Sequence, residues 1–148
     1  MVLFYYGKLN LENDLISPLF NSMSKNTFKL LQRAYNIIEF YSGDKLAVIM
    51  FKRNDFEETG TSLDDTDAFP DIPLQLKSVK FCILASEDDK GYFRVSLRSK
   101  GNLSARGVAE TFGGGGHLNA SGCKIFGPYD EVKEKLLQNT IKTLGWKL

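Results

Sequence analysis

The sequence has few of the residues from which disulfide frameworks and metal centres are built. Its 148 residues include two cysteines, Cys82 and Cys123, and a single histidine, His117. Two cysteines in apolar surroundings are too few for a disulfide scaffold, so we expect both to be buried free thiols. A histidine with no second histidine or cysteine beside it does not make a metal site. We therefore expect this chain to bind no metal and no cofactor of its own.

A charge imbalance and long apolar runs are also missing. Nineteen basic and eighteen acidic residues leave a formal charge of +1, so no overall field holds long nucleic acid by counterion release. No apolar run reaches the length of a membrane span, and the first residues lack the basic start of a signal peptide. We expect a soluble, cytoplasmic protein with no membrane partner, whose contacts with anions are local.

The residues that are present, 43% of them hydrophobic, can fill a sizeable core. Apolar residues recur at helical spacing from residue 11 to 41, where Pro18 interrupts the first part and Ser24 is placed to cap the second. Because this stretch has no strand of its own to cover, we interpret residues 1–42 as a helical interdomain connector that packs on another part of a larger protein.

Residues 43–148 alternate between strand and helix patterns and form the second predicted domain. We expect strands at 46–51, 79–86, 91–98 and 122–126, and helices at 54–58, 104–112 and 128–144. The unbroken apolar run 46–51 predicts a strand covered on both faces, and residues 87–91 predict a hairpin turn. Residues 61–73 read as a loop with one helical turn. The predicted fold class is α/β, a mixed sheet with helices packed on it.

Four consecutive glycines, Gly113 to Gly116, precede a segment that we predict to begin a helix at His117. Glycines leave backbone N–H groups accessible to an anion, so this arrangement suits a phosphate cradle; the alternative is a flexible turn. The imidazole of His117 can donate to a phosphate oxygen or pass a proton, although a lone histidine also occurs as a structural residue.

A second polar motif, Ser96-Leu-Arg-Ser-Lys-Gly101, ends a predicted strand in two cations and a hydroxyl. Arg98 can grip a phosphate with two parallel hydrogen bonds, Ser99 can add a third, and Lys100 can contribute charge. The alternative is a solvated strand end.

Together, Ser96–Gly101, Phe112–His117 and Asn119–Gly122 resemble the DHH-associated domain, which is the C-terminal half of DHH phosphoesterases. The nearest subgroup is the bifunctional oligoribonucleases and 3'-phosphoadenosine 5'-phosphate phosphatases. The resemblance covers roughly residues 45 to 145 and includes Asp55–Gly60 and Asp65–Pro73. In that family the N-terminal half carries an Asp-His-His signature and a pair of manganese ions, and the associated domain closes over the cleft and grips the substrate phosphate.

The resemblance implies which residues contact phosphate: Arg98 and His117 with the glycines Gly113, Gly114, Gly115 and Gly116, and as weaker candidates Ser99, Lys100 and Asn119. No Asp-His-His occurs, so the resemblance implies that the metal-bearing catalytic half is absent, and we expect this chain alone to be inactive. The implied partners are a DHH catalytic domain and short RNA or nucleotide phosphates, and the connector helix makes a homodimer a further hypothesis. We interpret the acidic Asp65–Pro73 loop as part of a domain interface, since its carboxylates repel phosphate.

A non-catalytic function is the competing hypothesis. Alanyl-tRNA synthetases and their relatives carry a similar glycine-rich C-terminal domain that contacts RNA. His117 directly after the glycines, together with Arg98 and Lys100, favours the phosphoesterase side.

Overall fold

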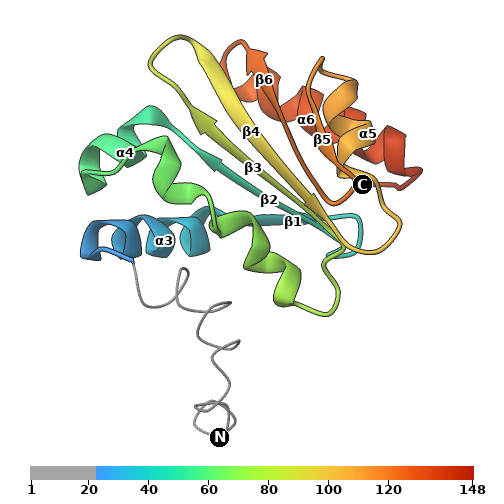
Figure 1. Cartoon of the computed structure of the whole chain (residues 1–148), viewed down its shortest axis with the longest axis horizontal. Helices are drawn as coiled ribbons and strands as arrows, with labels where there is room; N and C mark the ends of the chain where they lie inside the picture. The colour runs from blue at the N-terminus through green and yellow to red at the C-terminus, as the bar shows by residue number, and fades with distance from the viewer. Residues whose placement is uncertain (1–22) are drawn as a thin grey trace, which may run out of the picture.

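The computed structural model describes residues 23–148. The helices predicted before residue 23 lie outside the described residues. The elements, labelled as in Figure 1, are α3 (Lys25–Ile37), β1 (Glu39–Tyr41), β2 (Leu46–Phe51), α4 (Arg53–Thr59), the 3-10 turns η2 (Leu63–Thr66), η3 (Phe69–Asp71) and η4 (Pro73–Gln75), β3 (Phe81–Glu87), β4 (Tyr92–Ser99), α5 (Ala105–Glu110), β5 (Gly115–His117), β6 (Ala120–Phe126) and α6 (Tyr129–Leu144).

The six strands form one mixed sheet in the order β1-β2-β3-β4-β6-β5. β2 and β3 pair in parallel, and every other pair is antiparallel. Strand β2 is an unbroken apolar run and is buried along its whole length, because helices cover both of its faces. The hairpin between β3 and β4 closes with a 2.8 Å hydrogen bond from the Asp88 N–H to the Tyr92 carbonyl. The predicted α/β class and mixed sheet are confirmed.

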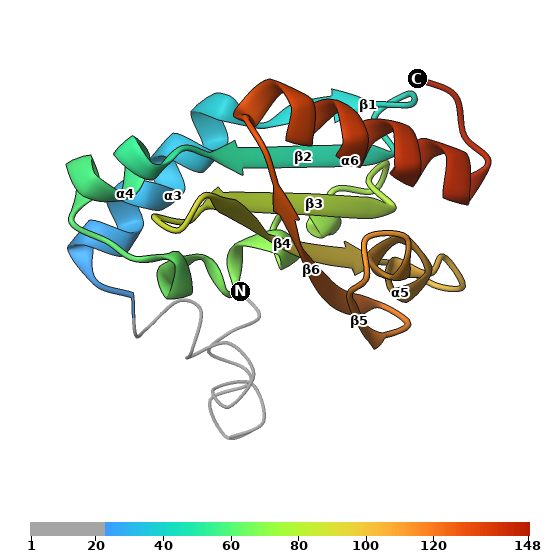
Figure 2. The same cartoon turned by 90° about the horizontal axis from the view of Figure 1, so that it is seen from above.

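The helices lie in two layers on opposite faces of the sheet (Figures 1 and 2). Helices α5 and α6 cover one face and share a core with alternate residues of β2, β3, β4 and β6. Helix α3, the segment after α4 and the 3-10 turns cover the β2 and β3 side of the other face, around Phe51, Phe69 and Leu84. On this second face the outer strands carry partly or fully exposed residues. Helices and turns therefore cover both faces of the sheet at β2 and β3, whereas at β4, β6 and β5 the second face is exposed.

The N-terminal prediction is partly wrong. The Ser24 side chain caps α3, accepting from the Thr27 N–H at 3.0 Å, as predicted. The helix ends at Ile37, however, and Glu39–Tyr41 is a strand rather than helix because it pairs with β2. Leu30 and Ala34 of α3 are buried in the same core as Phe51. Residues 25–41 thus pack on the sheet of this chain, contrary to the expectation that they lack a strand to cover, and their role as an interdomain connector stays a prediction.

Two further local expectations differ from the structure. Residues 61–73 contain successive 3-10 turns rather than a loop with one helical turn. No helix begins at His117: Gly115–His117 is a strand that pairs with Ala120–Gly122 across the turn at Leu118 and Asn119. Within residues 23–148, no helix combines the length and apolar character that crossing a membrane requires.

Candidate functional site

The open part of the second sheet face is the one exposed surface to which several predicted site residues contribute. Successive residues of a strand point to opposite faces, and on β4 the odd-numbered residues 93, 95, 97 and 99 are buried in the core. We call the opposite surface the polar sheet face; it consists of Arg94, Ser96 and Arg98 on β4, Ala120, Gly122 and Lys124 on β6, and Gly115 and His117 on β5.

Arg98 and His117 lie in one row across this face. Arg98 is opposite Ala120, and Ala120 is opposite His117. Residues opposite each other in an antiparallel pair project to the same side, and neighbouring strands are about 5 Å apart, so two strand spacings separate the Arg98 and His117 backbones by about 10 Å. Ala120 between them is too small to fill the space. The row therefore places an arginine and a histidine on the same face of the sheet, two strands apart.

The Arg98 side chain is held on two sides. Its Nη1 donates to the Leu97 carbonyl at 3.0 Å, and its Nε lies 3.7 Å from the carboxylate of Asp71. The arginine is 24% exposed and Asp71 is 61% exposed. Among the described residues, Nη2 has no hydrogen-bond partner. A solvent-facing carboxylate at that distance is a weak partner, so an incoming phosphate can replace it.

The thiol next to this row is not a nucleophile. Cys82 on β3 is opposite Arg98 and fully buried. Burial raises the pKa of the Cys82 thiol to about 12, and the Asp71 carboxylate adds to the rise. Burial also raises the pKa of the Cys123 thiol, to about 11. Both cysteines are buried free thiols, as predicted.

Steric crowding requires a glycine at Gly114 and Gly116 but not at Gly115. A Cβ on Gly114 would collide with the Gly122 carbonyl and lie 2.6 Å from the Cβ of Cys123, and a Cβ on Gly116 would lie 2.7 Å from the Ala120 carbonyl. These two glycines let the hairpin approach β6 closely. Gly115 has ordinary backbone angles and no atom within 4 Å of a built Cβ.

Because β5 is an edge strand, the N–H groups on its outer side pair with no strand. The Gly113 and Gly114 N–H groups donate to the Glu110 and Ala109 carbonyls at the end of α5. Accessible amides in the glycine run are therefore confined to β5, at a sheet edge and not at a helix N-terminus.

The three weaker phosphate candidates, Ser99, Lys100 and Asn119, make hydrogen bonds within the protein. Ser99 points into the core side and donates to the Leu103 carbonyl at 2.6 Å, and the Asn119 amide donates to the Ser99 hydroxyl at 2.9 Å. Lys100 donates to the Leu76 carbonyl at 2.9 Å. Ser99 and Asn119 hold the loop after β4 against the β5–β6 turn. The parity of β4 puts Ser99 on the opposite face from Arg98. The phosphate contacts of Ser99, Lys100 and Asn119 stay predictions.

The polar sheet face also contains residues that the sequence motifs did not indicate. Arg94, Ser96 and Lys124 belong to this face by the strand register. They also contribute to a shallow hollow of about 490 Å³ whose lining includes Phe112, Gly114 and Cys123 from the α5 side of the sheet. The Arg94 guanidinium pairs with carboxylates of the acidic segment, 2.8 Å from Asp64 and 3.4 Å from Asp67. The period-two alternation of β4 would have placed Arg94 and Ser96 beside Arg98. Lys124 required knowledge of the β4–β6 register.

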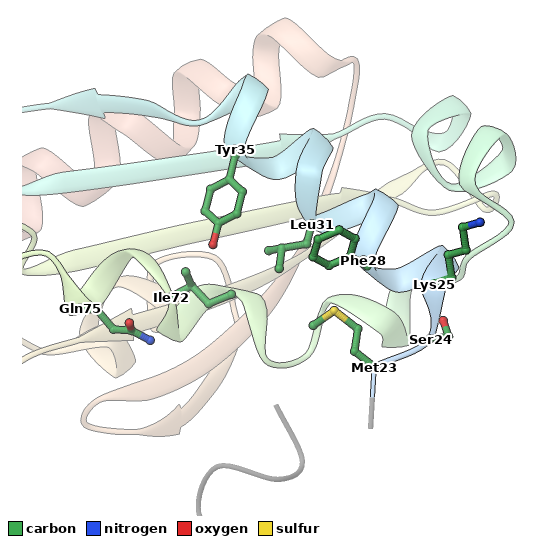
Figure 3. Close-up of a pocket in the computed structure, with 8 residues that line it drawn as sticks. All are labelled: Met23, Ser24, Lys25, Phe28, Leu31, Tyr35, Ile72 and Gln75. Atoms are coloured by element: carbon green, nitrogen blue, oxygen red, sulfur yellow. The ribbon is translucent and has the colours of Figure 1, made fainter. Parts of the chain in front are cut away.

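A second hollow is apolar and lies away from this face. Its volume is about 470 Å³, and its lining includes Phe28, Leu31 and Tyr35 of α3 with Ile72 of the 3-10 segment (Figure 3). Figure 3 shows these rings and aliphatic chains gathered between α3 and the turns, with Lys25 at one end. Phe28 is 53% exposed. Such a lining suits an apolar side chain and not a phosphate, so this hollow is not the candidate phosphate site.

Comparison with known proteins points to one family. The DHHA1 domain matches residues 43–145 of the chain. The bifunctional oligoribonuclease and PAP phosphatase NrnA of Thermus thermophilus is 27% identical over 112 residues, which are 75% of this chain and 33% of that protein. The chain thus spans about a third of the length of this curated relative.

Two solved structures share the fold. An exopolyphosphatase-related protein from Bacteroides fragilis superposes with a TM-score of 0.82 and 27% identity, over 90% of this chain and 39% of that one. A pGpG-specific phosphodiesterase, PggH, from Vibrio cholerae superposes with a TM-score of 0.54 and 18% identity, over 82% of this chain and 40% of that one. At that identity the second likeness shows the fold alone.

Proposed function

Because the chain belongs to the DHHA1 domain family, we propose that it is the substrate-binding part of a DHH-type phosphoesterase and that its polar sheet face binds the phosphate of a short oligoribonucleotide or small nucleotide. The name of the Thermus thermophilus relative, an oligoribonuclease and PAP phosphatase, supports this class of substrate. That relative is about three times as long as the matched part, which leaves room for a catalytic half outside the residues it shares with this chain.

The observation that carries the proposal is the row formed by Arg98, Ala120 and His117. The guanidinium supplies a planar pair of donors for two phosphate oxygens. The imidazole on the far side of Ala120 donates to a third oxygen or passes a proton to it. The outer N–H groups of β5 lie beside His117 and add uncharged donors at the sheet edge. Together these groups stabilise negative charge on a phosphoryl group without needing a metal ligand from this chain.

The manganese ions of the family do not fit the side chains described here. Within residues 23–148, no three histidine, cysteine, aspartate or glutamate side chains come together closely enough to hold a metal ion. We assign the metal ions, the activation of water and the hydrolysis to a DHH catalytic half, which would be the partner of this domain. The role left to this chain is to bind and orient the phosphate.

The proposal is tested by titrating the chain with 3'-phosphoadenosine 5'-phosphate and following backbone amide shifts by NMR and the Kd by calorimetry. We expect the largest shifts at Arg98 and at residues 113–117. Arg98→Ala should weaken binding by about 1.5–3 kcal/mol, the contribution of a hydrogen bond to a charged group. Arg98→Lys should recover only part of this loss, because it keeps the charge without the planar fork. Arg106→Ala, an exposed arginine on α5 on the opposite side of the sheet, is the matched control.

Two results would overturn the proposal. One is an Arg98→Ala variant that melts like the wild type and keeps its affinity. The other is a set of shifts confined to the acidic segment around Asp65 to Asp71, with the glycines unmoved.

A further inference from the structure

The far end of the polar sheet face carries an exposed aromatic pair. Phe126, the last residue of β6, is 67% exposed. Its ring centroid lies 5.5 Å from that of Tyr92, the first residue of β4 and its opposite partner. The Lys124 ammonium group lies 4.9 Å from the centre of the Tyr92 ring. Two π surfaces and a cation therefore meet at one exposed position.

The strand register puts this pair on the same side of the sheet as the proposed phosphate site. Tyr92 and Arg98 are both even-numbered residues of β4, and their partners Phe126 and Ala120 share the parity on β6. Six residues of strand separate Tyr92 from Arg98, which corresponds to about 20 Å. Between them on the same face lie the small residues Ser96 and Gly122, which are opposite each other. The long side chains of Arg94 and Lys124 also lie on this stretch of the face.

Between Tyr92 and Arg98, the charges on the polar sheet face favour a negatively charged ligand near Lys124. Arg94 is largely neutralised, because Asp64 and Asp67 both pair with it. Lys124 makes no ion pair within the described part of the chain and is exposed on β6. Exposed aromatic rings interleaved with cations are the surface that single-stranded nucleic acid binds, since bases stack on the rings and phosphates meet the cations.

We propose that Tyr92 and Phe126 form a stacking platform for a base of a single-stranded oligonucleotide whose phosphate is bound at Arg98 and His117. This rests on the proposed function and adds to it a preference for length. A mononucleotide bound at Arg98 cannot reach a ring about 20 Å away, whereas an oligonucleotide of several residues can. The platform thus distinguishes oligonucleotides from mononucleotides.

A structural role is the alternative, since cross-strand aromatic pairs also stabilise the ends of antiparallel strands. Affinity for ligands of two lengths separates the two roles. Calorimetric titration of the chain with adenosine 5'-monophosphate and with hexaadenylate RNA gives a Kd for each ligand. We expect Phe126→Ala to weaken hexaadenylate binding about five- to tenfold, within the range for one stacked base, and to leave the mononucleotide Kd unchanged. Phe126→Trp should retain the affinity.

Phe28→Ala is the matched control, since Phe28 is an exposed phenylalanine on α3 away from this face, and it should change neither Kd. The platform is overturned if Phe126→Ala changes neither Kd, which would assign the rings to another partner, or weakens both equally with a lower Tm, which would assign them to the sheet. Failure of the proposed function would look different: Arg98→Ala would then leave the mononucleotide Kd unchanged, whatever Phe126→Ala does.

Discussion

Substitution by alanine should destabilise the protein at Gly114, in the β5 hairpin, but not at its neighbour Gly115. An alanine methyl at Gly114 would lie 2.6 Å from the Cβ and 2.9 Å from the Cα of Cys123, besides its collision with the Gly122 carbonyl. Backbone atoms cannot move aside as a flexible side chain can, so we expect the overpacking penalty of about 1–3 kcal/mol. For a domain of this size, about 4 °C of Tm is lost per kcal/mol. Gly114→Ala should therefore lower the Tm by about 4–12 °C.

Gly115→Ala should leave stability almost unchanged. No atom lies within 4 Å of its built Cβ and its backbone angles suit alanine, so the free energy of unfolding should move by no more than about 0.5 kcal/mol. Gly115 shares the parity of His117, so the methyl would project onto the polar sheet face beside the proposed phosphate site. The loss of one hydrogen bond to the phosphate, about 1 kcal/mol, corresponds to an affinity about fivefold weaker.

Thermal melting by circular dichroism and calorimetric titration with 3'-phosphoadenosine 5'-phosphate measure both variants. Equal Tm values for Gly114→Ala and the wild type would refute the close approach of the hairpin to β6. A Gly115→Ala variant with unchanged Kd would show that phosphate does not approach the sheet at that point.

Two further predictions concern stability. Ser99→Ala should lower the free energy of unfolding by about 0.5–1.5 kcal/mol, because it removes a hydrogen bond to the partly buried Leu103 carbonyl, which keeps only the 3.4 Å contact of the Asn119 amide. Calorimetric titration should show no change in phosphate affinity for the folded variant, and a selective loss of affinity would support Ser99 as a ligand. The pKa of Glu39 is lowered by a hydrogen bond from Lys133, and partial burial opposes this shift. A carboxyl whose pKa is lower in the folded state stabilises the fold above the ordinary glutamate pKa. This contribution is lost as the pH falls through the lowered pKa. Glu39→Gln should therefore reduce the acid-side slope of unfolding free energy against pH, measured by urea titration between pH 3 and 7, and an unchanged slope would contradict the pairing.

Much of the architecture follows from residue patterns, because burial sets them directly. The unbroken apolar run of β2 and the turn between β3 and β4 are local signals. Strand β5 gives no such signal, since glycines have no side chains to alternate, and its pairing depends on β6. Strand β1 was assigned to a helix because Glu39–Tyr41 continues the preceding apolar pattern, and only pairing with β2 makes it extended.

In the candidate site, too, some residues are evident from the local sequence and others only from the long-range strand register. Arg98 and His117 stand out by residue type beside a glycine run, and the structure brings them into one row. Ser99 was grouped with Arg98 because the motif was treated as a continuous stretch, whereas neighbouring residues of a strand face opposite sides. Applying that alternation to β4 would have separated Ser99 from Arg98 and placed Arg94 on the same face as Arg98. Lys124 and the contact of Arg98 with Asp71 depend on long-range register and on the 3-10 turns, which no local pattern specifies.

The alternation of β4 has a consequence for how such a domain diverges. Its odd-numbered residues belong to the core, where most replacements disturb packing, and its even-numbered residues are partly exposed on the polar sheet face. Changes at positions 92, 94, 96 and 98 can therefore accumulate in a lineage with little penalty to folding, and they alter the surface offered to a ligand. A duplicated gene could shift from one phosphorylated ligand to another through these four positions while the rest of the strand stays under purifying selection.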